Sequence, residues 1–171
     1  MILLLIFGSS NTEKEFYKPI KEELENLVKS IFSDKEVHLE ITAKKGFSNK
    51  LKSQIPDYLE IVFQFLKDVK PDITGFIKQN YGSEIIVIEV KDEPIKLDHI
   101  YQIKKYAELL NAKYALLIST HEIPEEIKRL CKKVYAVLSL PAYNKITLVY
   151  YDQEKSKFEE WFEEIPFKAK D

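Results

Sequence analysis

Apolar residues recur along the chain with two periods, and each period predicts one kind of element. From residue 13 to residue 31 they return every three or four positions, as on one face of a helix. The residues of that face are Phe16, Ile20, Leu24, Leu27 and Ile31. A capping-box sequence at 12–15 predicts where the helix begins, and Pro19 predicts a later start or a kink.

Strand patterns, either alternating or continuously apolar, occupy much of the remaining chain. The predicted strands are 1–10, 36–42, 72–78, 84–91, 113–119, 134–138 and 145–151. The further predicted helices are 97–110, 124–133 and an acidic, solvated tail helix over 152–164. Helices placed between strands predict a single α/β domain with a mixed sheet.

Two segments between the first strands fit more than one element. Residues 43–54 are polar and rich in lysine, which predicts a surface loop or a short helix. Residues 55–69 contain a set with helical spacing, which comprises Ile55, Leu59, Val62, Leu66 and Val69. They also contain a set with the alternation of a strand, which comprises Leu59, Ile61, Phe63 and Phe65. The length of the segment favours the helix.

Composition narrows the class of protein. The chain has 171 residues, of which 45% are hydrophobic and 32% are charged, as expected for one folded domain. Its net charge is −2, so any binding of nucleic acid has to come from a local basic patch. The apolar start of the chain is too short to span a membrane and has no basic residues before it. These features predict a cytoplasmic protein without a membrane partner.

Scarce residue types exclude several kinds of chemistry. Four scattered glycines cannot form a Rossmann fingerprint or a P-loop. A single cysteine, Cys131, excludes an intrachain disulfide and a CxxC pair, and it argues against a thiolate metal site. The three histidines are far apart, and no HExxH zinc helix occurs. Metal chemistry would therefore use oxygen ligands, which favours Mg²⁺, Mn²⁺ or Ca²⁺.

A turn-forming sequence, NYGS, joins two of the predicted strands and sets their pairing. A turn centred between Asn80 and Tyr81 would place Asp72 opposite Glu89, with Lys91 on the same strand face as Glu89. Two carboxylates about 5 Å apart repel by roughly 3 kcal/mol at an effective dielectric of about 20. Lys91 supplies one compensating charge, and a divalent cation between the carboxylates would supply two more.

The sequence of this hairpin resembles the PD-(D/E)XK nuclease superfamily. Pro71 and Asp72 match the PD of the motif, and Glu89-Val90-Lys91 matches ExK on the following strand. The resemblance implies that Asp72, Glu89 and the Val90 carbonyl ligate Mg²⁺ or Mn²⁺. It also implies that Lys91 orients the attacking water or stabilises the charge that develops on the phosphate.

A second part of the resemblance follows on the next predicted helix. Gln102 and Tyr106 match the QxxxY motif of RecB-type members, and their spacing puts both on one helix face. The resemblance implies that they support the site or contact the nucleic-acid backbone. It covers residues 70–140 and implies a restriction-endonuclease-like αβββαβ core, with a mixed central sheet flanked by helices. The N-terminal strand and helix and the C-terminal hairpin or helix would elaborate that core within one domain, 1–171.

Many members of this superfamily add an acidic residue from the first helix. Glu13 falls on the apolar face of the predicted helix and Glu23 falls at its edge, so both are candidates. Glu60 is a further candidate, whereas Glu15 is explained by the capping box. Without this acid the site would hold one metal ion, or none tightly.

The implied activity is hydrolysis of phosphodiester bonds, with DNA as the substrate, by a nuclease that depends on Mg²⁺ or Mn²⁺. The alternative is a non-catalytic domain of nuclease-like fold that binds DNA or a protein partner in a larger complex. A third reading is an unrelated α/β protein in which the motif is a coincidence. Nucleases that cut two strands are often twofold dimers, so a homodimer is one option.

Overall fold

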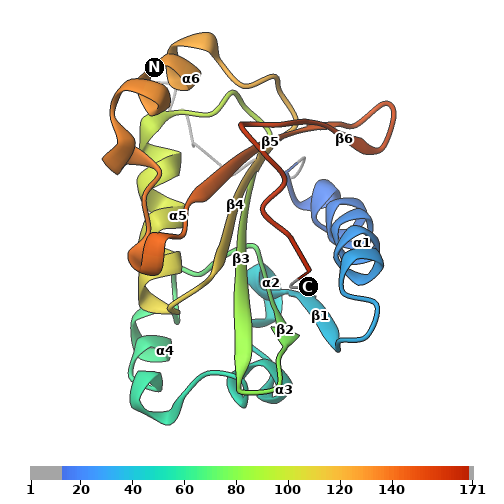
Figure 1. Ribbon diagram of the computed structural model, residues 1–171, viewed down its shortest axis with the longest axis vertical. Coiled ribbons are helices and arrows are strands. Elements are labelled where there is room, and N and C mark those ends of the chain that lie inside the picture. Colours follow the sequence, from blue (N-terminus) through green and yellow to red (C-terminus); the bar gives the residue numbers. More distant parts are fainter. Residues whose placement is uncertain (1–12, 170–171) are drawn as a thin grey trace, which may run out of the picture.

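The computed structural model describes residues 13–169, and its centre is a six-stranded sheet with the strands in sequence order (Figure 1). The strands are β1 (Val37–Ile41), β2 (Ile73–Lys78), β3 (Ser83–Lys91), β4 (Tyr114–Ser119), β5 (Ile146–Asp152) and β6 (Lys157–Trp161). The α-helices are α1 (Glu13–Ile31), α2 (Thr42–Lys45), α3 (Asn49–Lys52), α4 (Val62–Phe65), α5 (Leu97–Leu109) and α6 (Glu125–Lys133). The short 3₁₀ turns are η1 (Asp57–Leu59), η2 (Tyr135–Val137) and η3 (Pro141–Tyr143).

The sheet is mixed, as the sequence predicts. The first three strands pair antiparallel, β3, β4 and β5 pair parallel, and β6 returns antiparallel to β5. Parallel neighbours need a crossover between them, and α5 and α6 lie in the two crossover segments. None of the helices within residues 13–169 is both long and apolar enough to cross a membrane.

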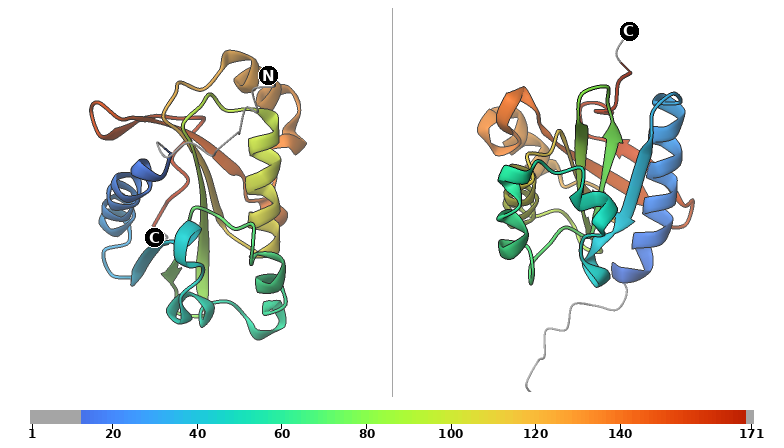
Figure 2. Two further views of the ribbon diagram at one scale, coloured as in Figure 1. Left: turned by 180° about the vertical axis from the view of Figure 1, so that it is seen from behind. Right: turned by 90° about the horizontal axis from the view of Figure 1, so that it is seen from below.

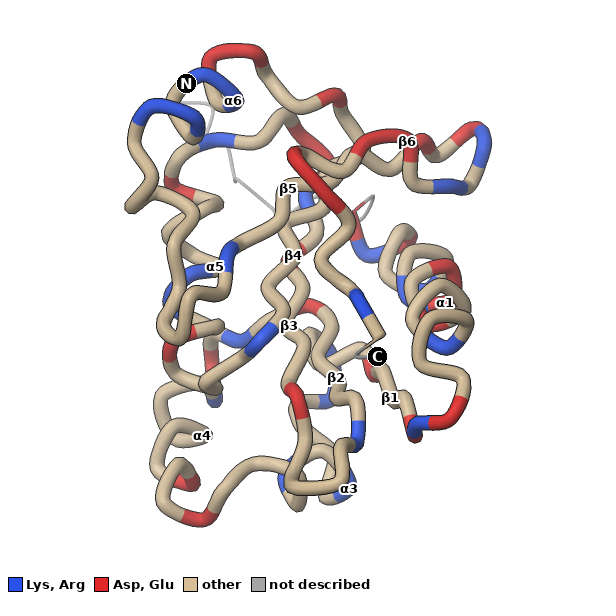
Figure 3. The backbone as a smooth tube through the Cα atoms, in the orientation of Figure 1, with Lys and Arg blue, Asp and Glu red and all other residues tan. Residues whose placement is uncertain are grey.

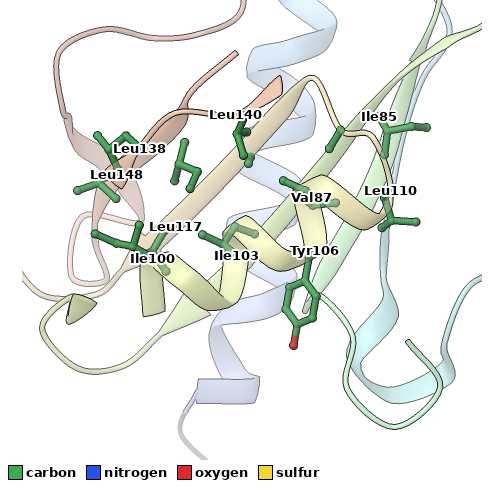
Figure 4. Close-up of a cluster of buried hydrophobic side chains, with 14 of the residues drawn as sticks. Ile85, Val87, Ile100, Ile103, Tyr106, Leu110, Leu117, Leu138, Leu140 and Leu148 are labelled. Atoms are coloured by element: carbon green, nitrogen blue, oxygen red, sulfur yellow. The ribbon is translucent and has the colours of Figure 1, made fainter. Parts of the chain in front are cut away.

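Helices cover both faces of the sheet, and the two faces bury separate apolar clusters. On one face α1 packs with Ile20, Leu24 and Val28, all fully buried. On the other face α5 packs with Ile100 and Ile103 (Figure 4). Figure 2 shows α1 on one side of the sheet and α4, α5 and α6 on the other. The site described below lies where these two layers meet one end of the strands.

Burial on both faces explains the continuous apolar run of β3. Ile86 and Ile88 join the cluster beneath α1, whereas Ile85 and Val87 join the cluster beneath α5. The same alternation brings Glu89 to the α5 side, directly after the buried stretch. A charged residue is therefore carried into the interior near the end of a strand that is buried on both faces.

Several predicted elements are confirmed. Helix α1 matches the predicted first helix and runs through Pro19. The strands predicted around β1 to β5 and the helices predicted at α5 and α6 are present, and residues 43–54 contain the short helices α2 and α3. The strand predicted over 1–10 and the cap at Thr12 lie outside the described residues.

The prediction of one helix over residues 55–69 is wrong. The segment forms only η1 and the one-turn helix α4, joined by turns. Pro56, before η1, is extended (φ −58°, ψ 142°), and the backbone leaves the helical region again at Leu66 (φ −98°, ψ 13°). Apolar side chains point both inward and outward along this segment, so the sequence satisfies two periods at once.

The strand predicted over residues 134–138 is also absent. These residues form η2 and the turn that follows it, with Val134 and Tyr135 exposed. The apolar run is short, and only Val137 and Leu138 at its end enter the core. The short apolar run of residues 134–138 therefore reflects contact with the core and not pairing in the sheet.

The tail helix predicted over residues 152–164 is instead strand β6. A β-bulge shifts the register of β5 and β6 between Tyr150 and Tyr151. The bulge leaves Phe158 and Trp161 on the same side, with ring centroids 5.1 Å apart, although they are three positions apart in sequence. That spacing imitates a helix, which is why the pattern predicts the wrong element.

Candidate metal and phosphodiester site

The hairpin of β2 and β3 has the predicted register. Ile73 pairs with Ile88, so Asp72, one residue before β2, stands opposite Glu89. The main chain of Asp72 is held on two sides. Its N–H donates to the Ile88 carbonyl at 3.1 Å, and its carbonyl accepts from the N–H groups of Thr42 and Ala43 at 2.9 and 3.2 Å. The position of Asp72 is thus fixed by β3 and by the start of α2.

The Asp72 carboxylate is buried, with 8% of the residue exposed, and each of its oxygens accepts a hydrogen bond. The hydroxyl of Tyr17, on α1, donates to Oδ1 at 2.7 Å, and the N–H of Val90 donates to Oδ2 at 2.8 Å. Burial raises the pKa of Asp72, and these two hydrogen bonds and the charge of Lys91 oppose that rise. The phenol and the strand N–H therefore orient this carboxylate.

Glu89 is still more deeply buried, with 3% exposed, and its two oxygens differ. Oε1 accepts from the Lys91 ammonium at 2.8 Å, whereas Oε2 is buried without a hydrogen-bond partner among the described residues. Burial raises the pKa of Glu89 to about 8, and the charge of Asp72 adds to the rise while Lys91 opposes it. A buried polar atom without a partner is uncommon and costly, so Oε2 marks a place for a cation or a proton.

Lys91 is the positive charge of this cluster. Burial alone would lower the pKa of Lys91, but the charge of Glu89 and its hydrogen bond outweigh that effect and leave the pKa above its ordinary value. Lys91 is therefore charged at neutral pH and places one positive charge beside the two carboxyl groups.

The main chain of Val90 faces the same corner. In β3 the Lys91 carbonyl bonds to β4, accepting from the Thr120 N–H at 3.0 Å, so the main-chain groups of Val90 face β2 instead. The Val90 N–H already donates to Asp72, as described above. Near the Val90 carbonyl the chain carries Pro71, which has no N–H to donate. The Val90 carbonyl thus remains a candidate oxygen ligand.

The two acids suggested for the first helix lie in different places. Glu13 lies near the cluster: burial raises the pKa of Glu13, the charge of Lys91 opposes the rise and the charge of Asp72 adds to it. Glu23 is ten residues further along α1, about 15 Å along the helix axis. Its charge acts on Tyr151 of β5, whose pKa is raised first by burial and then by Glu23. Glu13 is the acid that the structure brings to the site.

Glu60, the remaining acidic candidate, is exposed and follows η1. It lies in the segment between α3 and α4 and takes no part in the hydrogen bonds of the Asp72–Glu89–Lys91 cluster. We therefore leave it out of the site.

Gln102 and Tyr106 lie together on α5 beside the carboxylates. The Gln102 amide donates to the Tyr106 hydroxyl at 3.3 Å. Figure 4 shows the Tyr106 ring leaving the apolar cluster with its hydroxyl pointing away from it. Burial raises the pKa of Tyr106, and the nearby charges of Glu89 and Asp72 raise it further.

The sequence did not single out two residues near the cluster. Tyr17 follows Glu13 by four positions on α1, and this helical spacing is a signal that could have found it. His99, in the first turn of α5, accepts from the Lys96 N–H at 3.1 Å and lies 3.1 Å from Glu93. Burial and the charge of Lys91 lower the pKa of His99, so it is a neutral capping residue next to the site.

A basic segment borders the site. Helix α2 begins at the two N–H groups that bond to Asp72, and Lys44 and Lys45 on it are exposed. Lys50 and Lys52 follow on α3, and no acidic residue occurs between Thr42 and Lys52. Elsewhere lysines and acids are interspersed along the chain (Figure 3). Lys44 and Lys45 are the lysines of this segment that lie next to the site, because Lys50 pairs with Glu36 at 2.9 Å and Gln54, just after α3, bonds to Lys78 and Ser83 at the turn end of the β2–β3 hairpin.

Within residues 13–169 no three side chains of His, Cys, Asp or Glu are grouped closely enough to hold a metal ion by themselves. The donors of this site are two carboxylates and a main-chain carbonyl. Comparisons of the chain with protein-family models, with curated proteins and with solved structures gave no match.

Proposed function

We propose that this protein is a divalent-metal-dependent nuclease that hydrolyses phosphodiester bonds of DNA with two carboxylates and a lysine. The observation that carries the proposal is the buried corner where Asp72, Glu89 and Lys91 meet and Glu89 Oε2 has no partner. The succession α1, β1, β2, β3, α5 and β4, with short helices between β1 and β2, agrees with the αβββαβ order of a restriction-endonuclease-like core.

The donor set fits Mg²⁺ or Mn²⁺. Mg²⁺ is usually bound through one or two carboxylates, with water and substrate phosphate completing the shell, so a site without a third side chain is suitable. Asp72, Glu89 and the Val90 carbonyl would hold the ion, and Glu89 Oε2 is the atom that most needs it. When bound, the ion would supply an activated water and neutralise charge on the phosphate.

The residues of the chain itself have distinct roles in this proposal. Tyr17 and the Val90 N–H keep the Asp72 carboxylate oriented before any ligand arrives, so no reorganisation is needed later. Lys91 keeps its proton and can turn from Glu89 toward the charge that develops on the phosphate. Tyr106, which is hydrogen-bonded to Gln102, supports the site from α5, whereas Tyr17 supports it from α1.

Lys44 and Lys45 give the proposal its substrate contact. They are exposed on α2, whose first N–H groups bond to Asp72, so they stand next to the cluster. Two lysines beside a metal site would contact a phosphate backbone without reading its sequence. Binding through such contacts weakens as salt concentration rises.

One observation favours the alternative, a non-catalytic domain that binds DNA or a protein partner. Lys91 already donates to Glu89 Oε1 within the protein, and both oxygens of Asp72 already accept hydrogen bonds. Because its polar atoms other than Glu89 Oε2 have hydrogen-bond partners, this cluster could serve only to stabilise the fold. The two proposals therefore differ in whether a cation enters this corner.

The test is cleavage of a panel of duplex, branched and single-stranded DNA, and of RNA, with Mg²⁺ or Mn²⁺. We expect Asp72→Asn and Lys91→Met to lower the cleavage rate by about 10²- to 10³-fold or more while the fold is kept. Asp68→Asn and Lys133→Met, which change an exposed acid and an exposed lysine elsewhere, are matched controls and should cleave normally.

If the wild type cleaves nothing in the panel, the enzymatic proposal fails. Calorimetry with Mn²⁺ then decides the role of the corner. Heat of binding that Asp72→Asn abolishes would retain the metal site, whereas no heat together with tight binding of DNA or protein would support the non-catalytic domain.

A further inference from the structure

The short segment between α3 and β2 is apolar on both of its sides. Its inner side packs Ile55, Val62 and Leu66 into the cluster beneath α5. Its outer side carries Tyr58, Ile61 and Phe65, which are 75%, 55% and 72% exposed. We call these three residues the outer stripe.

The outer stripe has the geometry of one helix face. Its members are three and four positions apart, and the backbone of Glu60 and Ile61, between η1 and α4, is also helical. Other strongly exposed aromatic residues, such as Tyr81 and Tyr143, stand alone in turns. A contiguous group of large exposed apolar side chains typically marks an interaction surface, so the outer stripe predicts a partner surface that covers it.

A hollow of about 920 Å³ lies alongside the outer stripe and carries both signs of charge. Lys52 and Lys67 line it together with Asp57 and Glu60, and all four residues are exposed. Within residues 13–169 none of these four side chains forms an ion pair. Lys50, two residues before Lys52, does pair with an acid, Glu36, at 2.9 Å.

We propose that the outer stripe and its charged rim form the interface of a homodimer with twofold symmetry. In such an interface both copies use the same patch. If one residue of the first copy contacts a second residue of the other copy, the same contact also occurs with the two copies exchanged. The proposal rests on the composition of this rim: two lysines and two acids, none of them paired within residues 13–169, would allow lysines of one copy to meet acids of the other. Phe65 is 72% exposed and does not line the hollow, and in this proposal it enters the hollow of the second copy.

The surface is separate from the metal and phosphodiester site, and the inference does not depend on that site. Figure 1 shows α4 beside the end of α5, and Figure 2 shows it on the opposite side of the sheet from α1. Tyr17 and Glu13, which belong to the site, lie on α1. A dimer formed through the outer stripe would leave the α1 side of both copies free.

The affinity should be modest. The patch contains fewer residues than the roughly 20–30 per partner of a standard stable interface. We therefore expect dissociation at protein concentrations on the order of micromolar. Aromatic residues at the centre of a small patch usually carry most of the binding, so Phe65 is the residue whose loss should weaken it most.

Sedimentation velocity of the full chain over a range of concentrations tests the proposal. Wild type should change from monomer to dimer, and Ile61→Ser with Phe65→Ser should raise the dissociation constant by about tenfold or more. Tyr81→Ser with Tyr143→Ser, which changes two exposed aromatic residues elsewhere, should leave it unchanged. Circular dichroism should show the same fold for all variants, because every changed side chain is exposed.

Charge reversal tests the symmetry itself. Asp57→Lys with Glu60→Lys makes the rim wholly positive, and Lys52→Glu with Lys67→Glu makes it wholly negative. Each variant alone should be monomeric because its copies repel, whereas an equimolar mixture should form a heterodimer. That recovery requires the patch of one copy to face the patch of another.

Three results would overturn the proposal. Wild type that stays monomeric up to its solubility limit would do so, as would a dimer that both serine variants and charge variants leave intact. A monomeric wild type whose binding of single-stranded oligothymidine is lost in the Ile61→Ser and Phe65→Ser variant would assign the outer stripe to nucleic acid instead.

Discussion

The corner at Asp72, Glu89 and Lys91 and the outer stripe on η1 and α4 are opposites. The corner places charged groups in the interior, where an unpaired charge costs several kcal/mol, and it pairs or hydrogen-bonds nearly every one of them. The outer stripe places Ile61 and Phe65 in water, where an apolar side chain costs the folded chain little, and nothing in residues 13–169 covers them.

The two regions differ in the kind of group that is left without a partner. At the corner a single buried atom, Glu89 Oε2, has no hydrogen-bond partner among residues 13–169, and burial raises the pKa of Glu89 to about 8. At the outer stripe apolar side chains are exposed to water, and no polar atom there is buried without a hydrogen-bond partner among residues 13–169. The unpartnered atom of Glu89 should affect the stability of the fold and its pH dependence. The exposed outer stripe should affect only the association of the protein.

The largest effect expected from a cavity-creating substitution compares the two sides of α4. Leu66 is fully buried and Phe65, its neighbour in sequence, is mostly exposed. Leu66→Ala should lower the free energy of unfolding by about 3 kcal/mol, because it leaves a cavity in the core. Phe65→Ala should change it by less than about 0.5 kcal/mol in dilute protein. Urea titration at a concentration where the wild type is monomeric measures both.

Equal losses of unfolding free energy in Leu66→Ala and Phe65→Ala would contradict the difference between the two sides of α4. They would mean that Phe65 is covered within one copy of the chain, and the outer stripe would no longer need a partner. A loss for Phe65→Ala that appears only at high protein concentration would sharpen the comparison, because a dimer adds stability by mass action.

The second prediction concerns pH and Glu89. Its folded pKa is about 8, above the ordinary value of 4.5, so between these pH values the folded state binds more protons than the unfolded state. The stability of the metal-free protein should therefore fall as pH rises from 5 to 8, by up to about 1.4 kcal/mol per pH unit from this group. Chemical denaturation of wild type and Glu89→Gln at several pH values measures the slope, which the variant should largely lose.

Glu126→Gln, on the exposed face of α6, is the control and should keep the wild-type slope. Parallel curves for wild type and Glu89→Gln would mean that Glu89 is ionised in the folded protein throughout this range. Mn²⁺ sharpens the test, because a cation binds the ionised carboxylate. With saturating Mn²⁺, the wild type should gain more stability at pH 8 than at pH 6.

The sequence predicts much of the corner because its residues lie on regular, strongly patterned elements. The turn at Asn80 and Tyr81 sets the hairpin register, and the apolar run before Glu89 identifies a strand buried on both faces. Register then brings Asp72 opposite Glu89 without any knowledge of tertiary contacts. Tyr17 was missed because its contact with Asp72 spans 55 positions of sequence and depends on how α1 docks.

The outer stripe and the C-terminal strand could not be predicted in the same way. In residues 55–69 the inner and outer sides are both apolar, so helical and alternating patterns coexist, and the chain follows neither for long. In β6 the bulge breaks the alternation and puts Phe158 and Trp161 on one side at helical spacing. In each case a requirement beyond the local period, such as strand pairing or apolar contact on a second side, decides the structure.

The smallest expected effect concerns Tyr17, which holds the buried carboxylate in place. Tyr17→Phe removes the donor to Asp72 Oδ1 and should cost about 1.5 kcal/mol at neutral pH. The cost should be smaller in acid, because this hydrogen bond lowers the pKa of Asp72 and its loss favours the protonated form. Tyr135→Phe, on an exposed turn, is the control. An equal cost at all pH values would mean that Tyr17 acts through packing alone, and the corner would then resemble the outer stripe in depending on apolar contact more than on charge.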